Sequence, residues 1–468
     1  MRILQATSEF FPYSKTGGLA DMVAGLSGAL AELGEDVTVA TPLYRGIRDR
    51  FSGMKPIGGE FTLPLGKQFF TGQWWHLEDE SGLTILFLEN AGFYDRPGIY
   101  MDGSDGYWDN PERFMFFSKA IARIAPEYDA VHVHDWQTAF VPMLLKVAGG
   151  TALPRTLLSI HNLAYQGQCD GDRFVISNLP DDTFDSEGPE YWGSLNFLKA
   201  GLHYADALST VSPSYAREIL TPEFGEGLDG VLRHREDSLT GILNGVDYKE
   251  WNTTQNPRLP ATYSVDDLTG KVVCKKRLLE EMGLPASSLP LFGVVSRLAH
   301  QKGIDVLVEC LTEILCEKTM QIVILGDGDQ SIASKLVKLR DQHPEYMQFV
   351  HGYDHDLAHR IEAGIDFFMM PSRFEPCGLN QIYSMKYGAV PLVHRVGGLR
   401  DTVNCENGPS RTGIEIRNVT IRDISSAVHD ACQMYSNTRE YQITQAAGMK
   451  SVFSWKDSAG HYQSILSS

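Results

Sequence analysis

The stretch from Pro371 to Gln381, PSRFEPCGLNQ, gathers residue types that could act on an anionic substrate. Pro376 restricts Glu375 to an extended conformation, and Gly378 lets the backbone approach a ligand closely. The helix expected after this turn would point unpaired N–H groups and a positive dipole end toward an anion. A carboxylate beside such a cradle suggests chemistry on a phosphorylated substrate. A loop glutamate whose proline and glycine only shape a turn fits the same residues.

A second glycine turn lies near the start of the chain, at Lys15-Thr16-Gly17-Gly18. A glycine pair beside a lysine suits close approach to a phosphate or a sugar. The pattern is not a phosphate-binding P-loop, which requires GxxxxGK[ST]. Because Gly-Gly is also common in ordinary loops, a purely structural turn is the alternative.

Two further polar side chains lie directly after apolar runs that predict strands. Asp135 follows the run AVHVH, and His161 follows the run TLLSI. The carboxyl ends of parallel strands meet at one edge of a sheet, so both side chains are expected there. His132 and His134 share one face of their strand. A metal site would need a third ligand that the nearby sequence does not offer.

Two cations, Arg297 and Lys302, lie at and after the end of another apolar run. Arginine can grip phosphate oxygens with two N–H groups and lysine adds a point charge. Both would stabilise the negative charge of a leaving phosphate. If two sheets face each other across a cleft, these cations converge with Asn244 and the groups above, and a diphosphate can be held without a metal. The carboxylate of Asp135 and the imidazole of His161 could then hold sugar hydroxyls, while Glu375 orients the sugar or stabilises an oxocarbenium-like centre.

Short glycine and acidic motifs in the second half allow other interpretations. The motif Gly326-Asp327-Gly328 faintly resembles a dinucleotide-binding fingerprint, but position 331 is Ser instead of the third Gly. Acidic pairs could instead bind a metal that holds a nucleotide diphosphate. These pairs are Asp327 with Asp329, and Asp354 with Asp356.

Two other classes of protein match parts of this sequence. A glycoside hydrolase requires two opposed carboxylates, and the chain has many, but the phosphate-binding features would then be unexplained. A non-catalytic glycan-binding protein could use exposed aromatic rings and would need neither the cations nor the glycine turns. Its candidate rings are Trp74, Trp75, Tyr107 and Trp108.

Expected strands and helices alternate along both halves of the chain and would hold these groups in place. This alternation predicts an α/β fold of two Rossmann-like, doubly wound domains that face each other across a deep cleft. The domains are expected at residues 1–240 and 241–453. A β-hairpin region is expected at 55–90, a long loop at 94–110, and irregular polar sequence from 248 to about 290. Strands are expected at 2–7, 36–40, 130–136, 156–162, 207–212, 291–297, 321–325, 348–352, 366–370 and 389–393, with helices such as 19–33 and 304–316 between them.

Composition narrows the class of function. A net charge of −18 over 468 residues argues against a nucleic-acid binder that relies on a basic surface. Local cations and helix ends can still hold an anionic small molecule. Seven dispersed cysteines without a CxxC motif indicate a reducing compartment. There is no signal-peptide pattern and no run near the ~18 apolar residues of a membrane span, so a cytoplasmic protein with no membrane partner is expected.

Taken together, the motifs of this chain resemble those of bacterial-type glycogen synthases, the relatives of plant starch synthases. They span nearly the full length in the family's order. They are KTGGLAD at Lys15–Asp21, YDRPG at Tyr94–Gly98, HDW at His134–Trp136, HNLAYQG at His161–Gly167, NGVD at Asn244–Asp247, SRL at Ser296–Leu298 with QKG at Gln301–Gly303, and EPCGL at Glu375–Leu379.

The resemblance implies the GT-B architecture and a retaining transfer of glucose from ADP-glucose. The acceptor would be the non-reducing end of an α-1,4-glucan, either glycogen or a maltooligosaccharide. The first domain would hold the glucan and the second the donor, and residues 454–468 would pack back onto the first domain. The family requires no metal or other cofactor.

The resemblance also implies roles for individual residues. Glu375 is the key carboxylate, and Tyr94 is a candidate substrate contact. Glucose would be positioned by Asp135 and His161, and the donor phosphates by Arg297 and Lys302. Other donor contacts would come from Lys15, Gly18, Asp21, Asn244 near the sugar, Tyr353 by the adenine, and Cys377, Gly378, Leu379 and Asn380.

One residue departs from the family pattern. Asn380 stands where many relatives have threonine, which keeps a small polar side chain and affects only fine donor contacts. The residues alone do not separate adenine from uracil as the donor base. A relative that uses UDP-glucose or another acceptor, and a glycan-binding homologue without activity, therefore remain alternatives.

Overall fold

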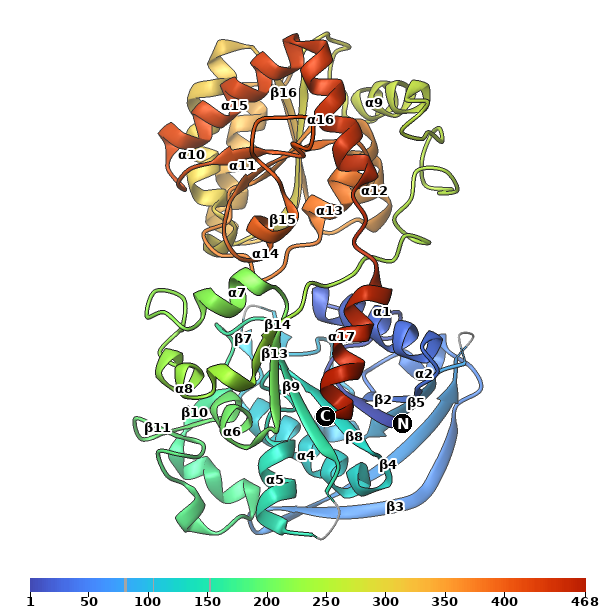
Figure 1. Cartoon of the computed structure of the whole chain (residues 1–468), viewed down its shortest axis with the longest axis vertical. Helices are drawn as coiled ribbons and strands as arrows, with labels where there is room; N and C mark the ends of the chain where they lie inside the picture. The colour runs from blue at the N-terminus through green and yellow to red at the C-terminus, as the bar shows by residue number, and fades with distance from the viewer. Residues whose placement is uncertain (80–81, 104, 151–152) are drawn as a thin grey trace. The chain divides into compact units, whose positions relative to one another are not determined.

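The computed structural model describes residues 1–79, 82–103, 105–150 and 153–468. The chain divides into two compact units. Unit 1 comprises Met1–Gly245 together with Ser454–Ser468, and unit 2 comprises Val246–Phe453. In each unit a sheet is covered by helices, and strands alternate with helices along most of the chain (Figure 1). The predicted α/β class is therefore confirmed.

The main sheet of unit 1 contains nine strands within the described residues. Seven neighbouring strands run parallel, and the two at one edge pair antiparallel. The order across the sheet is β14 (Leu239–Gly241), β13 (Ala207–Thr210), β9 (Arg155–Ile160), β8 (Ala130–His134), β1 (Arg2–Ala6), β2 (Asp36–Pro42), β5 (Thr84–Glu89), β4 (Gln68–Glu78) and β3 (Lys55–Leu65).

The central strands of this sheet bring separate segments of the chain to one edge. In the parallel register Ala6 lies opposite Val133, and His134 lies opposite Ser159. The residues that follow β1, β8 and β9 therefore emerge side by side at the carboxyl edge of the sheet. Asp135 and His161 are two of these residues.

The helices of unit 1 surround this sheet. The first, α1 (Gly18–Glu32), buries the apolar stripe that its spacing predicts. The last, α17 (Trp455–Ser467), lies beside α1 (Figure 1). A Cβ atom on Gly25 would lie 2.1 Å from Nε1 of Trp455, so the indole rests directly on the α1 backbone. The others are α2 (Ile47–Arg50), α3 (Ala91–Tyr94), α4 (Asn110–Ile124), α5 (Val141–Ala148), α6 (Phe197–Tyr204), α7 (Pro213–Glu218) and α8 (Asp229–His234).

Two segments of unit 1 were predicted in less detail. The hairpin expected at 55–90 is present as β3 and β4, apart from residues 80–81, which lie outside the described part. The loop expected at 94–110 contains a small antiparallel pair, β6 (Met101–Asp102) and β7 (Asp105–Gly106), while residue 104 lies outside the described part. A third sheet orders β10 (Gln168–Asp170), β12 (Ser194–Asn196) and β11 (Glu190–Tyr191).

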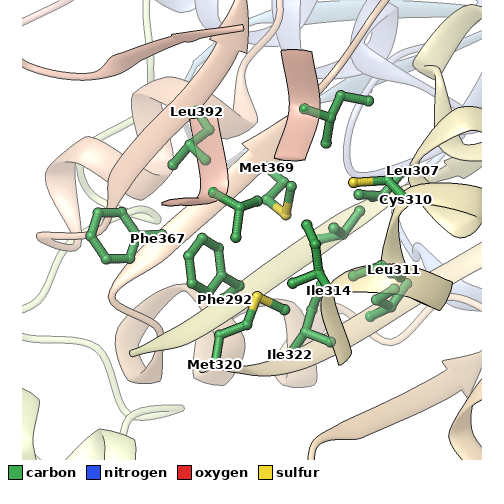
Figure 2. Packing of buried hydrophobic residues seen from close by; sticks show 14 of the residues in the cluster. Phe292, Leu307, Cys310, Leu311, Ile314, Met320, Ile322, Phe367, Met369 and Leu392 are labelled. Atoms are coloured by element: carbon green, nitrogen blue, oxygen red, sulfur yellow. The ribbon is translucent and has the colours of Figure 1, made fainter. Parts of the chain in front are cut away.

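The sheet of unit 2 is parallel throughout its described strands. Its apolar strands pack against α10 (Ile304–Glu317) in a core that includes Phe292, Leu311, Ile322 and Met369 (Figure 2). Burial on both faces explains why these strands are continuous apolar runs. The order is β17 (Met347–His351), β16 (Gln321–Gly328), β15 (Leu291–Leu298), β18 (Phe367–Met370), β19 (Val390–His394) and β20 (Ile414–Ile416).

One prediction for unit 2 was wrong. The segment expected to be irregular up to about residue 290 contains α9 (Thr269–Met282). Its buried face includes Gly270 and Lys271, and the lysine Nζ donates to the carbonyls of Ala363 and Tyr387. Because a buried glycine and a buried lysine interrupt the apolar stripe, the sequence lacks the helical signal there. The remaining helices are α11 (Gln330–Gln342), α12 (His355–Gly364), α13 (Asn380–Lys386), α14 (Gly397–Thr402), α15 (Ile421–Ser436) and α16 (Thr438–Lys450).

Among the described residues, no helix has both the length and the apolar composition needed to cross a membrane.

Candidate active site

In unit 1 the glycine turn between β1 and α1 is built around Glu9. This residue was not predicted from the sequence. The Glu9 side chain is buried. Its carboxylate accepts hydrogen bonds from the N–H groups of Thr16 (2.5 Å) and Gly17 (3.2 Å). It also accepts from the hydroxyls of Thr16 (2.7 Å) and Tyr100 (2.8 Å). Four donors therefore hold one carboxylate and fix the shape of the turn.

The charged residues of this turn interact with each other. Nζ of Lys15 lies 2.7 Å from a carboxylate oxygen of Asp21, in the first turn of α1. Both side chains are about one-third exposed, so the pair sits at the surface of unit 1. Gly18 is the first residue of α1, directly after the turn.

Asp135 and His161 meet at the same edge, as expected from the strand order. A carboxylate oxygen of Asp135 accepts from the N–H groups of His161 (2.7 Å) and Asn162 (3.4 Å). Asp135 has a φ of +55°, a strained value for a residue other than glycine. Burial raises the pKa of Asp135 to about 7, although the two N–H groups oppose the shift. This carboxyl group therefore titrates near neutral pH.

His161 is half-buried at the end of a chain of polar groups. Its Nε2 lies 3.0 Å from Nδ1 of His134, whose Nε2 lies 2.8 Å from Oε1 of Gln5. Burial lowers the pKa of His161 to about 3, so the imidazole is neutral at physiological pH. Beside this chain, His132 Nε2 lies 2.6 Å from the hydroxyl of Ser159. Both strand histidines thus form hydrogen bonds within unit 1, although Nδ1 of His132 has no hydrogen-bond partner among the described residues.

Two predicted site residues of unit 1 are buried. The Tyr94 side chain is completely buried, and its hydroxyl donates to the carbonyl of Arg113 at 2.9 Å. In this structure Tyr94 supports the surrounding segment and presents no surface to a substrate. Asn244 is also buried, and its Oδ1 has no hydrogen-bond partner among the described residues.

A groove of about 660 Å³ lies elsewhere in unit 1. Aromatic rings line much of it, and Trp108 is 77% exposed. Trp136, next to Asp135, forms part of its wall. A Cβ atom on Gly167 would lie 2.2 Å from the Trp136 ring, so glycine is required for the loop to pack there. The other rings are Tyr107, Tyr165 and Tyr191, and polar groups come from Asn110, Gln166, Asp170, Arg173 and Glu226.

In unit 2 the central feature is an ion pair between Lys302 and Glu375. Nζ of Lys302 donates to Oε2 of Glu375 at 2.5 Å, and the Ser372 hydroxyl donates to the same oxygen at 3.1 Å. The Glu375 side chain is only 6% exposed and that of Lys302 is 18% exposed. The predicted carboxylate and one of the predicted cations are therefore in direct contact.

Three glycines on two segments make this contact possible. A Cβ atom on Gly303 would lie 2.0 Å from the carbonyl oxygen of Pro371, so the Lys302 loop packs tightly onto the end of β18. A Cβ atom on Gly397 would lie 2.1 Å from the carbonyl oxygen of Glu375, and one on Gly398 would lie 2.1 Å from that of Cys377. The Gly397–Gly398 pair therefore supports the Glu375 loop from behind. This support was not predicted.

The remaining predicted residues of unit 2 lie at the ends of its strands or in the loops that follow them. Arg297 is exposed at the end of β15, and its Nη2 donates to Gln301 at 3.2 Å. Gly378 has a φ of +72°, and Asn380 donates from Nδ2 to the carbonyl of Val295 at 2.6 Å. Tyr353 follows β17 and is 68% exposed. Cys377 is buried, and Leu379 caps the start of α13.

The competing motifs of unit 2 have structural roles. Gly326 and Gly328 lie within β16, where Cβ atoms would come within 2.5 Å of Ser296 O and 2.6 Å of Leu298 O. These glycines permit close strand pairing and do not form a phosphate loop. Asp329 caps α11 and Asp354 caps α12.

Comparison with known families identifies both units. Residues 2–234 match the model of the starch synthase catalytic domain, and residues 290–434 match the group 1 glycosyl transferases. A glycogen synthase of Myxococcus xanthus is 43% identical over 100% of this chain and 99% of its own length. A glycogen synthase of Opitutus terrae is 40% identical, with 99% of each chain covered.

Solved structures agree with this assignment. The catalytic domain of starch synthase IV from Arabidopsis thaliana, bound to ADP and acarbose, superposes with a TM-score of 0.91 and 29% identity, covering 100% of this chain and 98% of that one. Sucrose-phosphate synthase from Thermosynechococcus elongatus shares the fold, with a TM-score of 0.62 and 18% identity over 99% and 98% of the two chains. The chain belongs to the glycogen and starch synthase family and is a GT-B glycosyltransferase with two Rossmann-like domains.

Proposed function

We propose that this enzyme transfers glucose from ADP-glucose to the non-reducing end of an α-1,4-glucan with retention of configuration. The observation that carries the proposal is the buried Lys302–Glu375 pair, with Arg297 at the end of β15 joined to the Lys302 loop through Gln301. Two cations beside a fixed carboxylate suit a sugar diphosphate, because the cations take the phosphates and the carboxylate faces the sugar. The preference for adenine rests on family membership and on the ADP bound to the Arabidopsis relative.

In this reaction the bond from glucose C1 to the diphosphate oxygen breaks, and the electron pair leaves on ADP. A new bond then forms on the same face of C1 to the oxygen of the acceptor's terminal hydroxyl, and the hydroxyl proton passes to the departing diphosphate. Lys302 and Arg297 would stabilise the charge that grows on the departing phosphate. Glu375 would lower the energy of the oxocarbenium-like sugar or orient it.

Unit 1 would hold the glucosyl unit and the acceptor, and unit 2 would hold the nucleotide. Asp135 would accept a hydrogen bond from a sugar hydroxyl, and the neutral His161 would position the ring. The aromatic groove of about 660 Å³ suits a glucan, since flat rings pack on the apolar faces of sugars while amides and carboxylates bind hydroxyls. Lys15, Gly18, Asp21, Asn244, Tyr353 and the Cys377–Asn380 backbone would complete the donor contacts.

We also propose a cytoplasmic location, because the seven cysteines are thiols rather than disulfides, as expected in a reducing compartment.

The test is release of nucleoside diphosphate from ADP-glucose and from UDP-glucose, with glycogen present and with or without EDTA. We expect turnover with ADP-glucose that EDTA does not reduce. Turnover with UDP-glucose alone would change the donor assignment. No turnover with either donor would leave a glycan-binding homologue, and loss of activity with EDTA would show that a metal takes part.

A further inference from the structure

Two histidines and a glutamate form a cluster in unit 2 that takes no part in the proposed reaction. His355 and His359 lie one turn apart on α12, and Glu250 lies in the segment before α9. Oε1 of Glu250 is 2.9 Å from Nε2 of His355 and 3.5 Å from Nε2 of His359. Across the described residues, this is the one group of at least three His, Cys, Asp or Glu side chains whose ligand atoms lie within 4.8 Å of one another.

His359 is held rigidly in this cluster. Its side chain is fully buried, and its ring stacks on Trp251 with centroids 3.9 Å apart. Its Nδ1 lies 2.7 Å from the hydroxyl of Tyr387 and 3.0 Å from Nδ2 of Asn256. Its Nε2 is buried and has no hydrogen-bond partner among the described residues. A buried nitrogen in this state carries a desolvation cost that a ligand would remove.

His355 is oriented in a similar way. Its ring meets Trp251 edge-on with centroids 5.9 Å apart, and its Nδ1 lies 3.2 Å from the hydroxyl of Tyr353. In both histidines a tyrosine hydroxyl therefore engages Nδ1 while Nε2 faces Glu250. Histidines that bind metals are usually held by such a partner on the second ring nitrogen.

We propose that Glu250, His355 and His359 bind a divalent transition-metal ion of the Zn²⁺ type. Two imidazoles and one carboxylate suit Zn²⁺, Co²⁺ or Ni²⁺, whereas Mg²⁺ and Ca²⁺ prefer oxygen ligands alone. Two histidines at i and i+4 on a helix are a known zinc-binding arrangement. Three protein ligands leave a position for water. None of the three ligands is among the groups assigned to glucosyl transfer.

Arg258 sets the affinity of this site. Its Nη2 lies 3.2 Å from Oε1 of Glu250, and its Nε donates to Asp356 at 2.8 Å. A bound cation has to displace the contact with Glu250, while Asp356 can keep the guanidinium nearby. The carboxylates of Glu250, Asp354 and Asp356 offset this cation and the positive end of α12.

A bound ion also has a consequence for the donor site, and this step rests on the proposed function. With Nε2 on the metal, His355 must carry its proton on Nδ1 and donate it to the Tyr353 hydroxyl. Tyr353 would then be fixed beside the donor base. We expect Zn²⁺ to change the KM for ADP-glucose more than it changes kcat.

The test is calorimetric titration of ZnCl₂, and separately MgCl₂, into the tag-free, EDTA-treated full chain. We expect one Zn²⁺ per chain and no Mg²⁺ binding. His355→Ala and Glu250→Gln should weaken Zn²⁺ binding by roughly 100-fold or more, beyond the range for loss of an outer partner. Arg258→Gln should tighten it. His429→Ala is the matched control, because His429 pairs with Glu317 at 2.8 Å and belongs to no such group of three.

Co²⁺ gives a second measurement that does not depend on removing a buried residue. Wild-type protein should show visible d–d absorption with Co²⁺ that is lost in His355→Ala. Equal Zn²⁺ affinity in wild type and His355→Ala, or no saturable binding in wild type, would overturn the site and leave a hydrogen-bond network. A failure of glucosyl transfer would not affect these titrations, so the two proposals can be separated.

Discussion

Each unit places a buried carboxylate at the carboxyl edge of its sheet beside a glycine-containing turn, but the partners of the two carboxylates differ. Glu9 of unit 1 is satisfied by two backbone N–H groups and two hydroxyls. Glu375 of unit 2 is satisfied by the ammonium group of Lys302 and the hydroxyl of Ser372. One carboxylate accepts backbone N–H groups of its own turn, and the other accepts only side-chain groups, one from the neighbouring Lys302 loop and one from its own loop.

The difference shows what a glycine turn can and cannot do. In unit 1 the N–H groups of Thr16 and Gly17 already donate to Glu9, so they are not available to a phosphate. If this turn approaches the donor, the contacts must therefore come from Lys15 and Gly18. In unit 2 the cation that neutralises Glu375 can also attract a phosphate. We infer that Glu9 is a positioning residue and that Glu375 takes part in the reaction.

Glu375→Gln should have the largest effect. The change removes the charge but keeps the shape, so turnover should fall by roughly 10²–10³-fold or more, as for loss of one preorganised electrostatic group. The donor KM should change much less. Initial rates of nucleoside diphosphate release at varied donor concentration measure both. Near-normal turnover would make Glu375 a second scaffold carboxylate like Glu9.

Lys302→Met should be the most destabilising change. It leaves Glu375 buried without its cation, which costs about 3–5 kcal/mol of unfolding free energy when a buried pair is broken. Urea denaturation measures this loss. The double variant Lys302→Met/Glu375→Gln should regain most of the stability but not the activity. If the double variant is as unstable as the single one, the ion pair is not the cause.

Glu9→Gln should lower stability more than catalysis. The amide accepts through one oxygen only, so at least one donor of the turn is left buried without a partner, at about 1–3 kcal/mol. Turnover should fall far less than in Glu375→Gln. Tyr100→Phe is the milder control, because it removes one of the four donors. A loss of turnover equal to that of Glu375→Gln would contradict the scaffold role.

The two Gly-Gly-Leu turns offer a matched pair of substitutions. Gly397 has a φ of +45°, and a Cβ atom there would lie 2.1 Å from the Glu375 carbonyl oxygen. Gly17 has a φ of −154° and open space around a Cβ atom. Gly397→Ala should therefore cost about 2 kcal/mol or more, and Gly17→Ala less than about 0.5 kcal/mol. Thermal or urea unfolding measures both costs. Equal costs for the two substitutions would contradict the difference between the two turns.

The pH dependence should show the smallest effect, about tenfold per pH unit. Asp135, with a pKa raised by burial to about 7 from the usual 3.8, accepts more strongly from a sugar hydroxyl when it is ionised. The value of kcat/KM should therefore fall as pH drops below 7, and Asp135→Asn should remove this acidic limb. Burial lowers the pKa of His161 to about 3, so His161 stays neutral in this range and adds no further pH dependence to kcat/KM.

The pH dependence that Asp135 gives to stability has the opposite sign to the one it gives to kcat/KM. The folded state raises the pKa of Asp135, so protonation favours folding. This contribution is complete below about pH 4 and is lost as pH rises to about 7. Unfolding free energies of wild type and Asp135→Asn, measured across this pH range, give the contribution of Asp135 to stability at each pH. If burial did not raise the pKa, the difference between the two proteins would not change with pH.

The sequence predicted the groups at strand ends better than the groups that support them. Strand order alone brings Asp135 beside His161, because parallel strands share a carboxyl edge. Lys302 and Glu375 also end up at one edge, although their direct contact depends on loop packing. Glu9 was not predicted, since a single glutamate after a strand carries no spacing signal and its partners lie in other segments.

Burial explains the other differences. Tyr94 was a candidate substrate contact because of its motif, yet the aromatic core of unit 1 encloses it. The helix α9 was missed because Lys271 occupies a buried position through two carbonyl contacts. Neither fact follows from residue type or periodicity, because both depend on what the rest of the fold places nearby.

The position of α17 has a consequence for how the protein is made. Unit 2 is inserted between β14 and α17 of unit 1, and the N–H of Val246 donates to the carbonyl of Phe453 where the chain leaves and returns. During synthesis the ribosome delivers all of unit 2 before Trp455 can cover Gly25 on α1. Unit 1 is thus completed only after unit 2, and a nascent chain exposes the α1 surface until α17 emerges.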